Sequence, residues 1–419
     1  MIMKQYVPQV RFDGFSGEWV TKSLSKIAHV IDPHPSHRAP EAVANGVPFI
    51  GIGDVAANGY VDFKNVRIVP YHIYDEHRQR YQVEVGDFAY GRVASIGKII
   101  DLSSNVEREY TYSPTMAIVK PVALYSPYLK GYMNTSVFKG RVDNKTTGST
   151  RKSLGVQDFR ELSVCYPEQQ EEQVKIGDYF QNLDVLINQH QQKHDILSNL
   201  KKAMLEKMFP KAGETIPEIR FDGFSGEWVT KSLSKIAHVI DPHPSHRAPE
   251  AVANGVPFIG IGDVAANGYV DFKNVRIVPY HIYDEHRQRY QVEVGDFAYG
   301  RVASIGKIID LSSNVEREYT YSPTMAIVKP VALYSPYLKG YMNTSVFKGR
   351  VDNKTTGSTR KSLGVQDFRE LSVCYPEQQE EQVKIGDHFR KLDLLINQHE
   401  QQITKLKNIK QACLDKMFV

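Results

Sequence analysis

Apolar and polar positions follow two different periods along the chain. Short apolar runs bounded by turn residues, such as Val47–Ile52 and Val66–Val69, are typical of buried strands. From Ile176 and again from Ile385, apolar residues recur at alternating steps of four and three, as in a helix that packs along one face. The pattern predicts a strand-rich domain, which we call a head, followed by a long helix, and this order occurs twice.

Each head is predicted to combine several strands with a few helices. We expect a short helix or strand at Glu18–Leu24 and a helix within Tyr125–Phe138. Glycine and asparagine clusters mark the turns between the expected strands. The further expected strands are Tyr81–Val85, Phe88–Val93, Ile96–Leu102, Tyr110–Val119 and Leu162–Cys165. The fold class that follows is α+β, a mixed α/β head with a curved, mostly antiparallel sheet.

The helical segments each carry one apolar stripe, interrupted in the first helix by His190, His194 and Lys201. A helix of about 40 residues is roughly 60 Å long, and a single stripe of that length needs a partner to cover it. The other helix is the obvious partner, and antiparallel pairing would relate the two halves by a pseudo-two-fold axis. The alternative is that each helix packs only on its own head. The predicted coiled-coil seam consists of Ile176, Phe180, Leu183, Ile187, Leu197 and Met204, and of Ile385, Phe389, Leu392, Ile396, Ile403 and Leu406.

One long block of the sequence occurs twice. Residues Arg11–Asp178 recur letter for letter as Arg220–Asp387, a length of about 170 residues that corresponds to a whole domain. Beyond these blocks the two helices diverge in sequence. We therefore predict a head at residues 1–166, a spacer helix at 167–209, a second head at 210–375 and a second helix at 376–419. Because one surface is presented twice, we expect a partner that is itself repeated or two-fold symmetric.

Composition and charge narrow the class of protein without assigning a function. The 419 residues carry a net charge of +4 and a pI of about 8.6, which permits basic patches for nucleic acid but does not require them. No apolar run fits a signal peptide or a membrane helix. The odd set Cys165, Cys374 and Cys413 favours free thiols in a reducing compartment, and we expect a cytoplasmic protein.

Motifs of an enzyme are weak or missing. The glycines of Gly51–Asp54 lack the spacing of a dinucleotide fingerprint and indicate a turn after a strand. Gly97 and Lys98 lack the upstream glycine of a phosphate-binding loop, and Asp32–Pro35 differs from the catalytic loop of an adenine methyltransferase. Asp87 with Lys98 could form a nuclease-like pair, but without a second suitably spaced carboxylate a structural turn aspartate is favoured.

The histidines and the polar loops of each head are the remaining candidates for chemistry. His34 and His37 are three residues apart, but no further ligand has a standard metal spacing, so we expect no metal site. Basic, hydroxyl and amide residues gather at Lys139–Arg141 and Asn144–Lys152. Such residues hold phosphates and read base edges, although a charged loop is more often simply solvated.

Four motifs in order resemble one known family. Val7–Trp19 looks like that family's usual start. Gly86–Arg92 with Ile96–Lys98 is similar to its pair of strands, which carries the motif G-D-apolar, then R, then G-I-G. Gly148–Leu154 resembles its G-S-T-x-x-x-L turn, and Pro167–Ile176 resembles its P…E-Q…I helix entry. With the order head, helix, head, helix, the chain resembles over nearly its whole length the specificity (S) subunit of a Type I DNA restriction-modification system.

The resemblance implies two target-recognition domains that read double-stranded DNA, separated by two long antiparallel helices. It implies no catalytic residue, metal or cofactor in this chain. Methylation would come from two modification (methyltransferase) subunits that carry S-adenosylmethionine and dock on the helices. Cleavage would come from restriction or translocase subunits that use ATP and Mg²⁺. The expected location is the cytoplasm of a bacterium or archaeon, with no membrane partner.

The resemblance and the polar loops together give a set of candidate DNA contacts. Basic members are expected to hold phosphates, whereas Arg92 and Asn144 are candidates for base edges, so that Arg92→Ala with Arg301→Ala would weaken specific binding by about 1–3 kcal/mol per lost bidentate pair. The alternative for Gly148–Leu154 is a structural turn at the helix entry. The candidates are His37, Arg38, Tyr90, Arg92, Lys98, Asn144, Lys145, Ser149, Arg151 and Lys152, with their copies His246, Arg247, Tyr299, Arg301, Lys307, Asn353, Lys354, Ser358, Arg360 and Lys361.

The identity of the two heads departs from the family, in which the two domains usually differ. Identical heads should read the same half-site, so we expect the target to be an interrupted palindrome. Two other functions stay open at this point. One is a scaffold or decoy that binds the methyltransferase subunits through its helices without reading DNA, and the other is a self-sufficient enzyme, which the missing cofactor loops disfavour.

Overall fold

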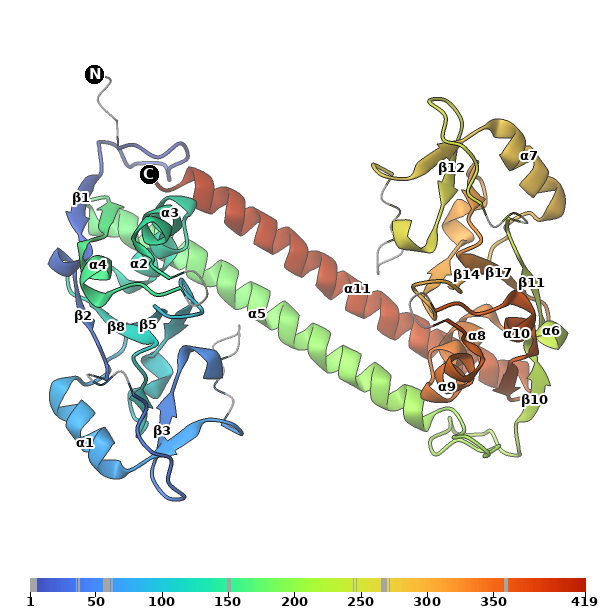
Figure 1. Cartoon of the computed structure of the whole chain (residues 1–419), viewed down its shortest axis with the longest axis horizontal. Helices are drawn as coiled ribbons and strands as arrows, with labels where there is room; N and C mark the ends of the chain where they lie inside the picture. Colours follow the sequence, from blue (N-terminus) through green and yellow to red (C-terminus); the bar gives the residue numbers. More distant parts are fainter. Residues whose placement is uncertain are drawn as a thin grey trace. The chain divides into compact units, whose positions relative to one another are not determined.

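The computed structural model describes residues 6–419, apart from residues 35, 37, 56–60, 62, 149–151, 244, 246, 265–269, 271 and 358–360. The chain forms two compact units, Met1–Gln191 with Gln401–Val419, and Gln192–Glu400. Each unit contains one head together with a part of each long helix (Figure 1). This division differs from the four predicted segments because both helices run from one unit into the other.

The described strands of the first head form three small sheets, and nearly all of their pairs are antiparallel. The largest sheet has the order β2 (Ala28–Ile31), β8 (Met116–Pro121), β5 (Phe88–Gly91) and β6 (Ile99–Asp101). The second has the order β4 (Arg67–Val69), β3 (Val47–Ile50) and β7 (Thr111–Tyr112), and the pair of β3 with β7 is parallel. The third joins β1 (Val20–Ser23) to β9 (Ser163–Tyr166). The predicted α+β class and antiparallel preference are confirmed.

The four-stranded sheet is buried on both faces, which explains why its central strand reads as a continuous apolar run. Successive side chains of a strand point to opposite faces. Phe88 and Tyr90 of β5 accordingly lie in a core cluster with Val119, whereas Ala89 lies with Ile118 in a second cluster on the other face. Residues of the helices between β8 and β9, and of the start of the first long helix, complete the first cluster.

The helices of the first head were only partly predicted. Two helices, α2 (Ser126–Met133) and α3 (Ser136–Lys145), occupy the predicted helical segment, and the Thr135 side chain accepts a hydrogen bond from the Phe138 N–H at the start of α3. A further helix, α4 (Val156–Glu161), follows the polar turn. The prediction of a strand at Tyr81–Val85 was wrong, because this segment is irregular and follows the unpredicted helix α1 (Tyr71–Arg80).

The second head repeats these elements, and its helix α6 corresponds to a short 3-10 helix at Leu24–Lys26 of the first head. Its sheets have the orders β11-β17-β14-β15, β13-β12-β16 and β10-β18. The strands are β10 (Val229–Ser232), β11 (Ala237–Ile240), β12 (Val256–Ile259), β13 (Arg276–Val278), β14 (Phe297–Gly300), β15 (Ile308–Asp310), β16 (Thr320–Tyr321), β17 (Met325–Pro330) and β18 (Ser372–Tyr375). The helices are α6 (Leu233–Ile236), α7 (Tyr280–Arg289), α8 (Ser335–Met342), α9 (Ser345–Lys354) and α10 (Val365–Glu370).

The long helices are α5 (Gln170–Lys207) and α11 (Gln379–Lys416), and they pair antiparallel within each unit. In the first unit, Tyr179 of α5 lies against Cys413 of α11 and Asp184 pairs with Lys410, so the contact positions rise on one helix and fall on the other. In the second unit, Lys201 pairs with Asp393. Because Lys201 and Lys410 are equivalent positions, as are Asp184 and Asp393, the two units make the same ion pair with the helices exchanged.

The helix ends also complete the cores of the heads, in addition to the contacts that the two helices make with each other. Phe180 of α5 and Phe418 beyond α11 lie together in the first core, with ring centroids 5.3 Å apart, and Phe209 and Phe389 meet at 5.5 Å in the second. The buried seam residues are Ile176, Phe180, Leu183, Ile385, Phe389, Leu392 and Ile403. The half-buried seam residues are Ile187, Leu197, Met204, Ile396 and Leu406.

The start of each long helix is fixed to its own head by a buried ion pair. Glu172 is fully buried and accepts from Arg11 Nε at 2.7 Å and Nη2 at 2.8 Å. A bidentate arginine–carboxylate contact sets orientation as well as distance. The equivalent pair, Arg220 with Glu381, orients α11 in the second unit. In the described part of the chain, no helix combines the length and the apolar character that crossing a membrane requires.

Candidate nucleic-acid interface

Three loops of the first head meet at the guanidinium of Arg92. Its Nη1 donates to the Leu154 carbonyl at 2.8 Å, and its Nη2 donates to the Pro114 carbonyl at 2.9 Å and to Asp32 Oδ2 at 3.3 Å. Asp32 opens the proline- and histidine-rich loop of residues 32–40, which we call the histidine loop. Pro114 lies in the turn before β8, and Leu154 ends the polar turn. The Arg92 side chain therefore holds the histidine loop and the polar turn together, and these two segments carry most of the predicted DNA contacts. We call them, with Arg92, the loop cluster.

The structure corrects the roles predicted for Arg92 and Tyr90. Arg92 is only 6 % exposed, and burial lowers the pKa of its guanidinium, an effect that the charge of Asp32 opposes and that of Arg160 reinforces. Tyr90 is fully buried and stacks on Phe159 with ring centroids 4.5 Å apart. Neither side chain is available to DNA on a folded head. Arg92 supports the loops and Tyr90 belongs to the core.

The second head shows the same arrangement, so Arg301 and Tyr299 are corrected in the same way. Arg301 donates to the carbonyls of Leu363 and Pro323, each at 2.9 Å, and to Asp241 at 3.3 Å. Tyr299 stacks on Phe368 at 4.6 Å. The recurrence follows from the identical sequence and is not independent evidence for a function.

The polar turn is clamped against the segment after β5 by backbone hydrogen bonds. Thr147 and Ser153 exchange a pair of backbone bonds, and Ala94 N–H donates to the Lys152 carbonyl at 3.2 Å. Ala94 has φ of +62°, a left-handed conformation that is uncommon for a residue with a side chain. Lys152 is exposed on this turn, as is Lys361 in the second head. Ser149, Arg151, Ser358 and Arg360 lie outside the described residues.

The other predicted contacts are distributed around this turn and the histidine loop. Asn144 and Lys145 are exposed at the end of α3, and Lys145 lies 3.5 Å from Asp158 and 3.6 Å from Glu161. Arg38 is exposed. The copies Asn353, Lys354 and Arg247 are placed alike, whereas His37 and His246 lie outside the described residues.

Lys98 is half-buried and turned toward its own head. Its Nζ donates to the carbonyls of Ile52 and Val55, and Lys307 makes the same contacts with Ile261 and Val264. These bonds hold the turn that follows β3, in which the Gly51 N–H donates to Asp54 at 2.7 Å. The glycines of Gly51–Asp54 therefore form a turn, as predicted. Two of the three N–H donors of Lys98 are therefore used on backbone carbonyls of its own head.

Asp87 is a structural residue with a different partner from the one considered in the sequence. It accepts from the Glu84 backbone N–H and from Lys120 Nζ, each at 2.8 Å, while Lys98 is directed elsewhere. Burial raises the pKa of Asp87, and the hydrogen bond from Lys120 opposes that rise. This geometry supports a turn aspartate at Asp87 and gives no nuclease-like pair with Lys98.

A buried chain of histidines anchors the base of the histidine loop. His34 Nε2 lies 3.1 Å from the Arg38 carbonyl, His34 Nδ1 lies 2.9 Å from His77 Nε2, and His77 Nδ1 contacts the Thr111 hydroxyl. A carbonyl only accepts, so His34 Nε2 carries a proton, its Nδ1 accepts from His77 Nε2–H, and His77 Nδ1 accepts from Thr111. Burial, with the nearby His34 and Arg80, lowers the pKa of His77 to about 4. His77 is therefore neutral at pH 7.

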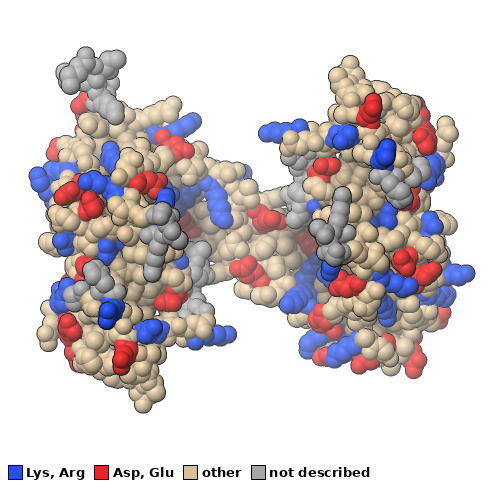
Figure 2. Space-filling view, viewed as in Figure 1, with Lys and Arg blue, Asp and Glu red and all other residues tan. Residues whose placement is uncertain are grey.

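Lysine and arginine side chains do not form one continuous patch on the visible surface. Figure 2 shows them interspersed with aspartate and glutamate over both units. Among the described residues, no group of three or more histidine, cysteine, aspartate or glutamate side chains is arranged to hold a metal ion. Cys165 and Cys374 are buried free thiols, and Cys413 is a half-buried one.

Comparison with solved structures identifies the architecture. No family model matches the chain, and no curated protein matches it in sequence. The structure aligns with the S subunit of a Type I restriction-modification system from M. genitalium at a TM-score of 0.66, with 12 % identity over 99 % of both chains. The chain has the fold of that S subunit. An HsdS subunit from Thermoanaerobacter tengcongensis also matches, at 14 % identity over 96 % of each chain and a TM-score of 0.37.

Within the S-subunit fold, the loop cluster around Arg92 contains residues that the sequence did not single out. Asp32 was considered only as part of a proline loop, yet it fixes that loop to Arg92. Arg160 of α4 donates through Nε and Nη2 to the Val30 carbonyl, at 3.1 and 2.6 Å. Asp32 could have been suspected from its place beside prolines, where aspartate often begins a turn. No signal in the sequence marks Arg160, because its partner is a backbone carbonyl 130 residues away.

Proposed function

We propose that this chain is the DNA-recognition subunit of a Type I restriction-modification complex. The observation that carries the proposal is that the whole chain adopts the S-subunit fold, and the order of sequence motifs supports it independently. In this proposal each head is a target-recognition domain, and the chain itself catalyses no reaction. Methyl transfer and cleavage belong to partner subunits that use S-adenosylmethionine, and ATP with Mg²⁺, respectively.

The exposed members of the loop cluster are the residues proposed to contact DNA. Lys152, Lys145 and Arg38 would hold phosphates, and Asn144 could read an adenine through its amide, which offers both a donor and an acceptor. Arg92 would act indirectly, by fixing the loops on which these residues lie. The same roles fall to Lys361, Lys354, Arg247, Asn353 and Arg301 in the second head.

Both heads are proposed to read the same bases. Arg11–Asp178 and Arg220–Asp387 are identical, so their loop clusters have the same chemistry. The two helices exchange roles in the ion pairs Asp184–Lys410 and Lys201–Asp393, so each head has the same kind of contact between its two helices. The target would then be a half-site, a spacer and the reverse complement of that half-site.

The paired helices are the proposed docking surface for two methyltransferase subunits. The two helices have diverged while the heads have not, which is consistent with a surface that is read by proteins and not by DNA.

Methylome sequencing of cells that produce this chain with its methyltransferase partner tests the proposal. The expected result is one methylated motif with two inverted copies of the same half-site. Cells with the partner alone are the control and should lack the motif. Two unrelated half-sites would contradict the shared reading of the two heads. Assembly with the partner but no new methylated motif would instead indicate the scaffold or decoy.

A further inference from the structure

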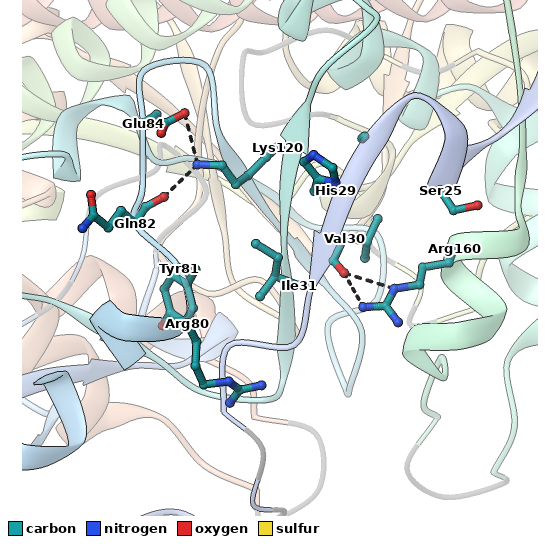
Figure 3. A pocket seen from close by; sticks show the side chains of 11 residues that line it. Ser25, His29, Val30, Ile31, Arg80, Tyr81, Gln82, Glu84, Lys120 and Arg160 are labelled. Atoms are coloured by element: carbon teal, nitrogen blue, oxygen red, sulfur yellow. Dashed lines mark hydrogen bonds and ion pairs between the residues drawn. The ribbon is translucent and has the colours of Figure 1, made fainter. Parts of the chain in front are cut away.

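A pocket of about 580 Å³ lies along β2, beside the loop cluster of the first head. The residues that line it come from β2 and the short 3-10 helix before it (Leu24–Lys26), from the end of α1 with the segment after it, from β8 and from α4 (Figure 3). Its polar walls are formed by Ser25, His29, Arg80, Gln82, Glu84, Lys120 and Arg160. None of the residues proposed to contact DNA lines this pocket.

Two of the charges that line the pocket are not neutralised by a carboxylate. Lys120 is paired with Asp87 at 2.8 Å and with Glu84 at 3.2 Å, so its charge is matched. In the described part of the chain, neither Arg80 nor Arg160 forms an ion pair with a carboxylate. Figure 3 shows their guanidinium groups approaching β2 from opposite sides. The pocket therefore presents a net positive charge to solvent.

Both arginines keep hydrogen-bond donors for a ligand. Arg160 uses Nε and Nη2 on the Val30 carbonyl, which fixes its plane, and a guanidinium has five N–H donors in all. Arg80 is exposed, and its contact with the Asp32 carbonyl is long, at 3.5 Å. Two such forks at one pocket match an anion with several oxygens, such as a phosphodiester, better than a single carboxylate.

The position of the pocket connects it to the loops that are proposed to read DNA. Asp32 follows β2, accepts from Arg80 through its carbonyl and pairs with Arg92 through its carboxylate. Asp32 therefore links Arg80, which lines the pocket, to Arg92 of the loop cluster. An anion held between Arg80 and Arg160 would lie next to the start of the histidine loop.

We propose that the pocket between Arg80 and Arg160 binds a backbone phosphate of the DNA duplex flanking the half-site. This inference rests on the proposed function and adds a sequence-independent contact to it. Phosphate contacts set the register of a protein on DNA and carry no base information. Arg289 and Arg369 are the equivalent residues of the second head, and Arg369 makes the same contacts with the Val239 carbonyl, at 3.1 and 2.7 Å.

The test measures DNA affinity of the assembled complex that carries Arg80→Gln with Arg289→Gln. Each lost phosphate contact should reduce the salt slope by about 0.9, which corresponds to roughly eightfold weaker binding at 0.1 M salt and about 60-fold for two copies. The ratio of affinities for target and scrambled duplexes should stay unchanged. Arg78→Gln with Arg287→Gln is the matched control, because it removes the same charge from the same helices outside this pocket.

The outcomes separate the pocket from the proposed function. If the unaltered complex binds target and scrambled duplexes equally, the DNA-recognition function is overturned and the pocket proposal with it. If the unaltered complex is specific, but Arg80→Gln with Arg289→Gln binds as tightly as it does, or no more weakly than the Arg78 control, only the pocket proposal is overturned. Unchanged DNA affinity with weakened binding of the methyltransferase subunit would also overturn it, and would assign the pocket to an acidic protein surface.

Discussion

At the scale of single residues, His77 belongs to a buried hydrogen-bond network under the histidine loop that should make the stability of the head depend on pH. The ring accepts from Thr111 and donates to His34, whose other nitrogen holds the Arg38 carbonyl. The pKa of His77 is lowered to about 4 in the folded head, whereas an unfolded histidine titrates near 6.5. Between these values the unfolded chain binds more protons than the folded one. Stability should therefore fall as the pH drops from about 6.5 toward 4.

This pH dependence is our first prediction. His77 and His286 should each reduce the free energy of unfolding by up to about 1.4 kcal/mol per pH unit over that window. The change His77→Gln with His286→Gln should lower stability at pH 7 but flatten the decline toward pH 5, measured by urea unfolding at each pH. His72→Gln with His281→Gln, at exposed positions, should behave like the unaltered chain. Parallel pH curves for the His77 variant and the unaltered chain would contradict the network.

Arg92 carries the second prediction, which replaces the direct role inferred from its type. Arg92→Ala removes the partner of two carbonyls and of Asp32 in the interior. Each buried acceptor left without a partner costs about 1–3 kcal/mol, so the unfolding free energy should fall by at least about 2 kcal/mol. Arg38→Ala, at an exposed site, should leave stability unchanged in the same thermal and urea unfolding measurements. Equal stability of the two variants would return Arg92 to the list of surface contacts.

The sequence could indicate that these residues matter but not which way they face. Tyr90 lies in the apolar run of β5 and Arg92 follows the glycine that ends it, and the burial of both depends on Leu154 and Phe159 far along the chain. Lys145 and Lys152 are exposed, because the end of a helix and a polar turn lie on the surface in most folds, and their contact with DNA stays a prediction. Residue type alone cannot separate an arginine that binds DNA from one that supports the loop beneath it.

At the scale of elements, the long helix fits its head through one glycine. A Cβ atom at Gly177 would lie 2.7 Å from the Tyr128 nitrogen and 2.8 Å from a ring carbon of Tyr125. The backbone nitrogen cannot move aside as a flexible side chain could. Because Gly177 has no side chain, α5 can approach α2 this closely.

Gly177→Ala with Gly386→Ala is the third prediction. The added methyl groups should destabilise each unit by about 1–3 kcal/mol, the usual cost of overpacking, measured by chemical unfolding. The matched control is Gly140→Ala with Gly349→Ala, at exposed helix positions where no atom lies within 4 Å of the added carbon. That control should be neutral or stabilising, because alanine favours a helix more than glycine does. Stabilisation by Gly177→Ala would contradict the close approach.

The pairing of the two helices was predictable from the heptad period of the sequence, but the packing of the residues beyond the helix ends was not. The heptad stripe identified Phe180 and Phe389 as seam residues, and both are buried. It did not indicate that Phe418 and Phe209, beyond the helix ends, would complete the heads' aromatic cores. Helix α1 was missed because it begins with aromatic and β-branched residues after Pro70, a composition equally typical of a strand. In both cases a tertiary contact, invisible in a local window, decides the structure.

The ion pair Lys201–Asp393 gives the fourth prediction, on the register of the helices. Lys201 is 22 % exposed and Asp393 is 48 % exposed, so solvent weakens the pair and a coupling of only about 0.2–1 kcal/mol is expected from a double-mutant cycle. Lys201→Asp should destabilise the second unit, and Lys201→Asp with Asp393→Lys should recover part of the loss. Lys202→Asp, at the exposed neighbouring position, is the control and should show no coupling to residue 393. Additive effects of Lys201→Asp and Asp393→Lys would contradict the pairing.

At the scale of the whole molecule, the chain combines two identical heads with two helices that have diverged. Letter-for-letter identity across Arg11–Asp178 and Arg220–Asp387 makes every contact within one block possible in the other, including those of Arg92 and Arg301. This duplication and the S-subunit resemblance were evident in the sequence. The bases recognised were not, because they depend on loop geometry and on contacts with a DNA partner.

The equivalence of the heads carries the last prediction. Lys152 and Lys361 are exposed at the same position of the polar turn, and each is proposed to hold one phosphate. Lys152→Ala and Lys361→Ala should each weaken binding of the assembled complex to its target by roughly eightfold at 0.1 M salt, and the double variant by the product of the two, because the sites are separate. Gel-shift titrations at several salt concentrations measure this, and Lys26→Ala with Lys235→Ala, at exposed positions outside the loop cluster, provides the control. Losses that differ more than twofold between the two single variants would contradict equal use of the heads, since identical domains on inverted half-sites have no reason to contribute unequally.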